Sequence, residues 1–182
     1  MKTKILLSTL LLIIIFFSCN KDDSNDKICS FNYQGIQYET PNGYYFKYNM
    51  EGVSGSVYQI YLSSCSYDVQ SHDFINNGNI NLVEFIIHSP SETELSSESY
   101  SYKYIDLGQD WNEVFVEPTT FTSPGIMANK INWDDEIFGD ENSSGNIDIT
   151  NIGEDFEFNY NFTLDNGKVV EGYFKGKLNQ IE

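Results

Sequence analysis

The stretch that decides the fold runs from residue 156 to residue 176 and reads FEFNYNFTLDNGKVVEGYFKG. Aromatic residues occupy every second position at its start, from Phe156 to Phe162, and polar residues lie between them. This period of two is typical of a β-strand that packs one face against a core. Asp165-Asn166-Gly167 then predicts a tight turn, so we expect the whole stretch to form a β-hairpin.

The register of this hairpin depends on the length of its loop. A two-residue Asn-Gly loop pairs Phe162 with Glu171 and places two lysines on the aromatic face. A three-residue loop, with Gly167 in the left-handed conformation, keeps that face apolar and covers two glycines with large rings. We therefore predict the second register. Its pairs are Phe162–Val170, Tyr160–Gly172, Phe158–Phe174 and Phe156–Gly176.

The remainder of the chain after residue 28 shows the same alternation, interrupted by turn residues. We predict strands at 31–33, 36–38, 44–50, 57–62, 80–87, 100–104 and from 147 onward, with 111–117 as a further candidate. The stretch 80–87 is apolar on both faces and should lie centrally. Residues 119–142 have no clean period, so we expect a loop with one short element. The chain thus predicts a single all-β antiparallel domain that closes as a barrel or a two-layer sandwich, and its chain order favours an up-and-down, lipocalin-like meander.

The first 28 residues have a different character. Lys2 and Lys4 precede an apolar run over residues 5–17, which is followed by Ser18, Cys19 and a polar, charged stretch. A basic start, an apolar run of about 13 residues and a small residue before the cut are typical of a secretory signal peptide. The run is too short for a membrane span, which needs about 20 apolar residues.

This segment resembles the signal of a bacterial lipoprotein, in which the cysteine becomes the first mature residue and carries acyl chains such as palmitate. Phe16 stands where that family usually has leucine, as in relaxed versions common in the Bacteroidota. The run Lys21-Asp22-Asp23 is similar to the export signal of surface lipoproteins in that group. The resemblance implies a signal peptide over 1–18, lipidation of Cys19, a flexible tether over 19–28 and a β domain over 29–182. It also implies an outer-membrane protein, anchored by lipid and facing the cell exterior.

The charge of the chain argues against some partners. There are 27 acidic residues and 10 basic ones, all lysine, so the formal charge is −17. Without the bidentate fork of arginine, such an acidic chain is a poor candidate for binding nucleic acid or phosphate. Acidity instead favours solubility at a surface, and it attracts cations.

Two cysteines remain beside the lipidated one. Cys29 and Cys65 form a candidate disulfide, because the protein crosses an oxidising compartment. Two free thiols are the alternative, since spacing in the sequence cannot test the distance that a disulfide requires.

Residues 140–151 resemble a calcium loop, with oxygen-bearing side chains at alternate positions and Gly145 at the sixth. Two features depart from that pattern. The twelfth position is Asn151, which lacks a bidentate carboxylate, and the alternation of residues 147–149 indicates a strand. The alternative is an Asx-rich turn before a strand. The candidate calcium ligands are Asp140, Asn142, Ser144, Asn146 and Asp148, and we expect no other cofactor.

The sequence contains no Gly-x-Ser-x-Gly or His-Glu-x-x-His motif of known hydrolases. Aromatic stripes usually fill a core, but tyrosine and tryptophan also tolerate a wet boundary and can hold a ligand. The candidate ligand contacts are Tyr44, Tyr45, Tyr100, Tyr102, Tyr104, Trp111 and Trp133.

We therefore expect a non-enzymatic, surface-anchored module that binds an extracellular glycan, host protein or small molecule. One alternative is a structural or accessory subunit of an outer-membrane complex, and another is a small hydrolase. A pocket lined by tyrosines would favour the binding module, and a flat apolar patch would favour the subunit. Two converging carboxylates with perturbed pKa values would favour the hydrolase.

Overall fold

The computed structural model describes residues 27–49, 54–75, 78–105, 118–130 and 136–181, and Cys19, Trp111 and Trp133 lie outside them. The regular structure of these residues consists of β-strands, which confirms the all-β prediction. The described residues contain no helix of the length and apolarity needed to cross a membrane. The strands are β1 (Ser30–Tyr33), β2 (Ile36–Glu39), β3 (Asn42–Tyr48), β4 (Ser56–Ser63), β5 (Tyr67–Asp68), β6 (Asp73–Phe74), β7 (Ile80–Ser89), β8 (Ser99–Tyr102), β9 (Thr120–Lys130), β10 (Ile137–Phe138), β11 (Gly145–Ile152), β12 (Asp155–Thr163), β13 (Val169–Gly176) and β14 (Leu178–Gln180).

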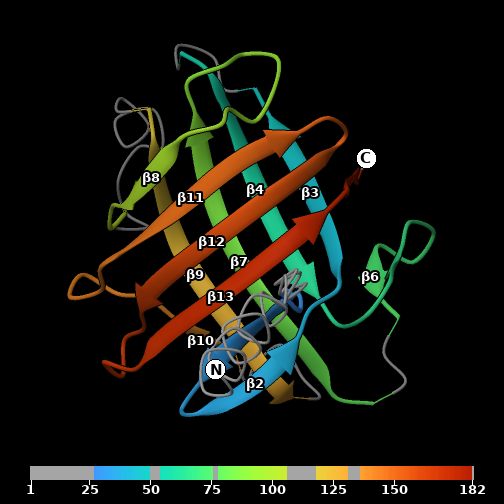
Figure 1. Ribbon diagram of the computed structural model, residues 1–182, viewed down its shortest axis with the longest axis vertical. Helices are drawn as coiled ribbons and strands as arrows, with labels where there is room; N and C mark the ends of the chain where they lie inside the picture. The colour runs from blue at the N-terminus through green and yellow to red at the C-terminus, as the bar shows by residue number, and fades with distance from the viewer. Residues whose placement is uncertain (1–26, 50–53, 76–77, 106–117, 131–135, 182) are drawn as a thin grey trace, which may run out of the picture.

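Twelve strands form one curled mixed sheet in the order β14-β3-β4-β7-β9-β8-β11-β12-β13-β1-β2, with β10 pairing off this path against β9. The strands β5 and β6 form a small second sheet. Figure 1 shows β11, β12 and β13 as a front layer that crosses the back layer of β3, β4, β7 and β9. Because β14 follows β13 after one residue and pairs with β3, the last part of the chain joins the two layers into a half-barrel.

The sheet departs from chain order at three places. β9 lies between β7 and β8 and runs parallel to β8, β14 runs parallel to β3, and β1 pairs with β13. The first departure comes from the stretch that was predicted to be mostly loop, because Thr120–Lys130 is a strand of 11 residues. Its register against β7 shifts twice, and Ser123 and Asn129 have positive φ angles. These irregularities break the period of two that identifies a strand in sequence.

The predicted hairpin of β12 and β13 is confirmed in register. Phe162 pairs with Val170, and Phe158 pairs with Phe174. Gly167 has a φ of 70°, and its N–H donates to the carbonyl of Leu164 at 2.9 Å, which closes the three-residue loop. The other two predicted pairs, Tyr160–Gly172 and Phe156–Gly176, are also formed.

The main core lies between the two layers. Phe85 of β7 is fully buried, and its ring centroid lies 6.4, 5.5 and 6.3 Å from those of Phe158, Tyr160 and Phe162 on β12. As predicted, β7 is central, since it pairs with β4 on one side and β9 on the other. Its outward-facing Ile80 and Leu82 join a second buried cluster with Phe74 and Met127, so this part of the back layer is apolar on both faces.

Candidate functional site

A cavity of about 380 Å³ opens where β3 and β4 meet the start of β12, β14 and the loop before β8. We call it the end cavity. Alternation along β3 explains its lining, because Tyr45 and Lys47 face inward while their neighbours face outward. The residues that carry its chemistry are Tyr45, Lys47, Tyr58, Glu94, Phe156 and Gln180.

Two tyrosine rings form the apolar wall of the end cavity. The ring of Tyr45 lies 5.7 Å from that of Tyr58, at an angle of 46°. The hydroxyl of Tyr45 donates to Oε1 of Gln180 on β14 at 3.1 Å. The strand that joins the two layers therefore also places a polar amide beside the tyrosine wall.

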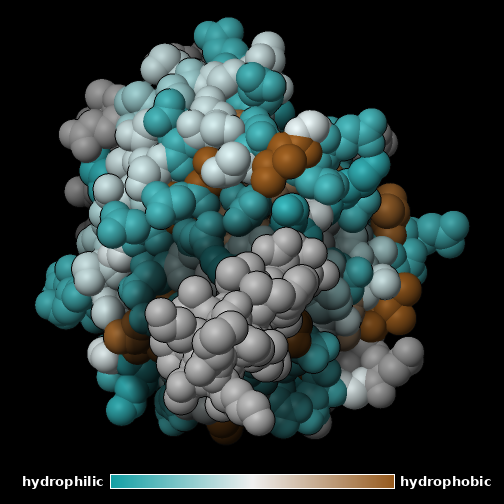
Figure 2. Space-filling model, in the orientation of Figure 1, coloured by the Kyte–Doolittle hydropathy of each residue, from teal (hydrophilic) through white to brown (hydrophobic). Residues whose placement is uncertain are grey.

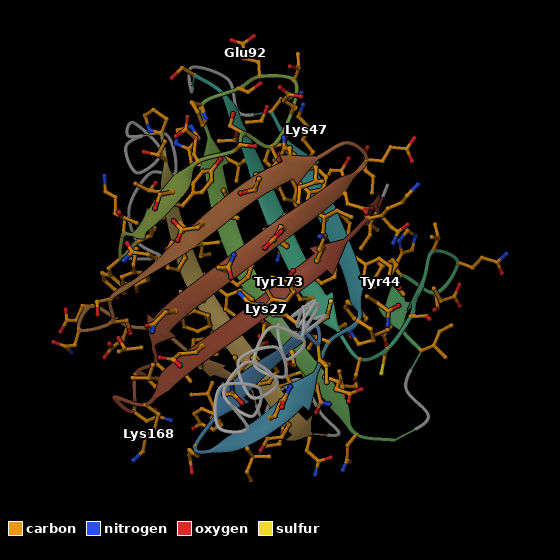
Figure 3. The ribbon with its side chains drawn as sticks, in the orientation of Figure 1. Lys27, Tyr44, Lys47, Glu92, Lys168 and Tyr173 are labelled. Carbon is orange, nitrogen blue, oxygen red and sulfur yellow. The ribbon has the colours of Figure 1, made fainter. Side chains whose placement is uncertain are left out.

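The ammonium group of Lys47 is held in place at the mouth of the cavity. Its Nζ donates to the backbone carbonyls of Glu92 and Thr93 at 2.8 and 3.1 Å and lies 5.7 Å from the centroid of the Tyr58 ring. Figure 3 shows Lys47 near the top of the molecule, close to Glu92. These contacts restrain the long side chain of Lys47, so less conformational entropy is lost when it binds a ligand.

The hydroxyl oxygen of Tyr58 is buried and has no hydrogen-bond partner among the described residues. Burial, followed by the neighbouring Tyr45, raises the pKa of Tyr58 to about 12. The hydroxyl therefore keeps its proton at neutral pH.

The other predicted ligand contacts do not gather at this site. Tyr44 faces the outside of the back layer, where its ring contacts Tyr67 and Phe74. Tyr100 is fully buried in the main core, so its predicted surface role is wrong. Tyr102 is partly buried and donates to the carbonyl of Asp140 at 2.7 Å, whereas Tyr104 is exposed.

Sequence reasoning found Tyr45 but missed Lys47, Tyr58 and Gln180. The three stand in different sequence settings. Lys47 is a lone lysine in an aromatic strand, Tyr58 is a tyrosine in a core strand, and Gln180 is a glutamine near the end of the chain. Lys47 and Tyr58 are opposite each other in the antiparallel pairing of β3 with β4, whereas Gln180 arrives through the parallel pairing of β14 with β3, which no local pattern indicates.

A pair of carboxyl groups lies on the outer face of the back layer. Nε2 of Gln59 donates to Oε1 of Glu84 at 2.6 Å. Glu136 lies beside Glu84 and over Gly125, where a Cβ atom would come within 2.6 Å of Glu136 Oε1. Burial, followed by the charge of Glu84, raises the pKa of Glu136 to about 8, and burial raises the pKa of Glu84. Neighbouring buried carboxyls of this kind share a proton at neutral pH.

The candidate calcium ligands lie in a turn followed by a strand. The carboxylate of Asp140 accepts from the N–H of Asn142 at 2.9 Å and from the hydroxyl of Ser143 at 3.2 Å. Strand β11 begins at Gly145, so Asn146 and Asp148 stand on an extended chain and pair with Asn161 and Asn159 of β12. Ser144 is bound through its backbone to Thr163. This geometry matches the Asx-rich turn, and calcium binding stays a prediction.

The candidate disulfide between Cys29 and Cys65 is not formed. Both are free thiols. Sγ of Cys29 accepts from the N–H of Lys175 at 3.3 Å and packs against the main core, whereas Cys65 packs against the second cluster on the opposite face of the back layer. The structure thus has the alternative of two free thiols, because the two residues pack against different cores.

Comparisons with known proteins give no relative for this chain. No protein-family model matches it, and searches of characterised proteins and of solved structures find no match.

Proposed function

We propose that this protein is a lipid-anchored protein of the bacterial outer-membrane surface, and that its β domain binds an extracellular glycan without catalysing a reaction. The observation that supports this proposal is the end cavity, a half-open space walled by tyrosine rings and edged by fixed polar groups. Its volume of about 380 Å³ lies within the range of about 300–1,000 Å³ of small-ligand sites.

A sugar ring suits this lining in two ways. Its apolar C–H face can lie on the ring of Tyr45, which is partly exposed and packs against the buried ring of Tyr58. Its hydroxyl groups can pair with the amide of Gln180 and the carboxylate of Glu94. A purely apolar ligand would take water away from the amide N–H groups of Gln180 and the carboxylate of Glu94 without replacing its hydrogen bonds, which favours a ligand rich in hydroxyl groups.

The start of the β domain lies away from the end cavity. Nζ of Lys27 lies 4.7 Å from the centroid of the Tyr173 ring on β13, and it donates to Oδ1 of Asn159 at 3.2 Å. Figure 3 shows Lys27 in the lower half of the view and Lys47 near the top. A tether that leaves the domain at Lys27 would keep the cavity mouth accessible to extracellular ligands.

A glycan array tests the proposal. We expect the full chain, carried by its lipid in phosphatidylglycerol nanodiscs, to bind a small set of related glycans. Tyr45→Leu should lose that binding, while Tyr104→Leu should retain it because Tyr104 is exposed and outside the cavity. Thermal melting would show that both variants are folded. Absence of glycan binding, or undiminished binding by Tyr45→Leu, would contradict the proposal.

The pair Glu84 and Glu136 favours a small hydrolase as the second candidate. The geometry of this carboxyl pair supports hydrolysis less well than the end cavity supports glycan binding, because neither Glu84 nor Glu136 lines that cavity. Retaining glycosidases separate their carboxyl groups by about 5 Å, which leaves room for the scissile bond, whereas these two are close enough to hydrogen-bond. Hydrolysis of chromogenic glycosides that Glu84→Gln abolishes would establish this second candidate.

The accessory-subunit alternative lacks a comparable observation on the face shown in Figure 2. There the hydrophobic residues form small separate patches among hydrophilic ones. A protein interface usually needs a broader apolar area.

A further inference from the structure

A second cavity, of about 270 Å³, lies on the outer face of the back layer, between β3–β4 and the small β5–β6 sheet. We call it the hairpin cavity. It is separate from the end cavity, because Phe46 on its wall alternates along β3 with the inward-facing Tyr45 and Lys47. Figure 3 shows Tyr44, which also faces outward, on the side of β6. The hairpin cavity is lined by Phe46, Tyr61, Tyr67, His72, Asp73 and Phe74.

Four aromatic rings enclose this cavity as a closed cycle of edge-to-face contacts. Phe46 meets Tyr61 at 81° and Tyr67 at 88°, with centroids 6.2 and 6.3 Å apart. Phe74 meets the same two tyrosines at 65° and 80°, with centroids 5.7 and 5.3 Å apart. Two rings come from the large sheet and two from the small one. Neighbouring rings that stand close to perpendicular form a box, whose walls present aromatic surface to its contents.

The charge around this box is negative. Asp73 lines the cavity and pairs across the small sheet with Asp68. Burial and then the charges of Asp73 and Asp68 raise the pKa of Tyr67, and burial and then the charge of Glu84 raise the pKa of Tyr61. The faces of aromatic rings also carry negative charge density. A cation would therefore be attracted both by the walls and by the carboxylates around them.

We propose that the hairpin cavity binds the methylated ammonium group of a small organic cation. Such a group spreads its charge over methyl groups, so it gives up little hydration when aromatic faces surround it. A bare metal ion would instead need several oxygen ligands, and Asp73 is the only carboxylate in the lining. This binding is independent of the proposed glycan site, because the two cavities share none of their lining residues.

Choline and its neutral isostere 3,3-dimethylbutan-1-ol test the proposal directly. The two have the same shape around the head group and differ in its charge. We expect choline to bind the full chain in phosphatidylglycerol nanodiscs, with the methyl protons shifted upfield by the rings, and empty nanodiscs serve as the blank. The neutral isostere should bind about 10-fold more weakly or worse.

Three variants test whether choline binds in this cavity. Tyr67→Leu should abolish choline binding, while Tyr45→Leu in the end cavity should leave it unchanged. Asp73→Asn should weaken choline binding several-fold without changing the affinity for the neutral isostere, and it keeps the claim testable if Tyr67→Leu fails to fold. Equal affinity for choline and its isostere would show an apolar pocket only. That result, an absence of upfield shifts, or unchanged binding by Asp73→Asn would overturn the proposal.

Discussion

Gly167 is the residue on which the predicted hairpin loop depends. A Cβ atom at this position would meet no other atom within 4 Å, so a substitution there is opposed by the backbone angle alone. We expect Gly167→Val to lower the free energy of unfolding by more than about 1 kcal/mol, because a β-branched residue rarely adopts positive φ. Gly167→Asn should cost much less, since asparagine tolerates this conformation. Urea denaturation of both variants checks this, and equal losses would contradict it.

Glu136 gives the stability of the protein a dependence on pH. Its pKa is about 8 in the folded chain and 4.5 as the ordinary value, so between these pH values the folded chain holds a proton that the unfolded chain has released. The free energy of unfolding should therefore fall as pH rises from 4.5 to 8, by up to ~1.4 kcal/mol per pH unit. Below pH 4.5 the carboxyl group of Glu136 is protonated in both states, and the stability that is lost at higher pH is fully present.

Glu136→Gln should flatten this dependence, because the amide is neutral at every pH. Glu154→Gln is the matched control, since Glu154 is exposed and pairs with Lys177 at the surface. Urea denaturation at pH 5, 6.5 and 8 would measure the slopes. An unchanged slope in Glu136→Gln would show that this carboxyl group does not hold the extra proton.

At the scale of elements, substitutions of two glycines, Gly172 and Gly176, test the register in which β12 pairs with β13. A Cβ atom at Gly172 would lie 2.2 Å from the ring of Tyr160, which is buried and cannot move aside. At Gly176 the nearest atom would be at an ordinary 3.4 Å. We expect Gly172→Ala to destabilise the protein by about 1–3 kcal/mol, the usual cost of overpacking, and Gly176→Ala to cost clearly less. Similar effects of the two changes on the melting temperature would contradict the register.

The same hairpin shows what the sequence can predict. Its strands alternate cleanly, and only one loop length keeps its aromatic face apolar, so local pattern and packing agree. β9 shows the opposite case. Two register shifts and a Pro124-Gly125 pair break its alternation, and its identity as a strand depends on pairing with β7 and β8. The end cavity follows the same rule, because Tyr45 was predictable from its own strand, while its partner Gln180 arrives through the parallel pairing of β14 with β3.

At the scale of the whole molecule, the anchor is predicted from residues outside the described part of the chain. We expect Cys19→Ala to release the protein from membranes, because it removes the thiol that would carry the acyl chains. Cys65→Ala should leave the protein membrane-bound. Phase partitioning in detergent and mass spectrometry of the mature chain would check this. A Cys19→Ala protein that stays in the detergent phase with residues 1–18 intact would contradict the lipoprotein assignment.

The central claim is that the end cavity is the site where this molecule meets its ligand. The most direct measurement is isothermal titration of the best-bound array glycan into the full chain and two lysine variants. Lys47 lies at the cavity mouth, and Lys168 lies in the β12–β13 turn at the opposite end of the view in Figure 3. We predict that Lys47→Met weakens glycan binding at least 10-fold and that Lys168→Met leaves it unchanged. Equal affinities for both variants and the parent protein would contradict the claim.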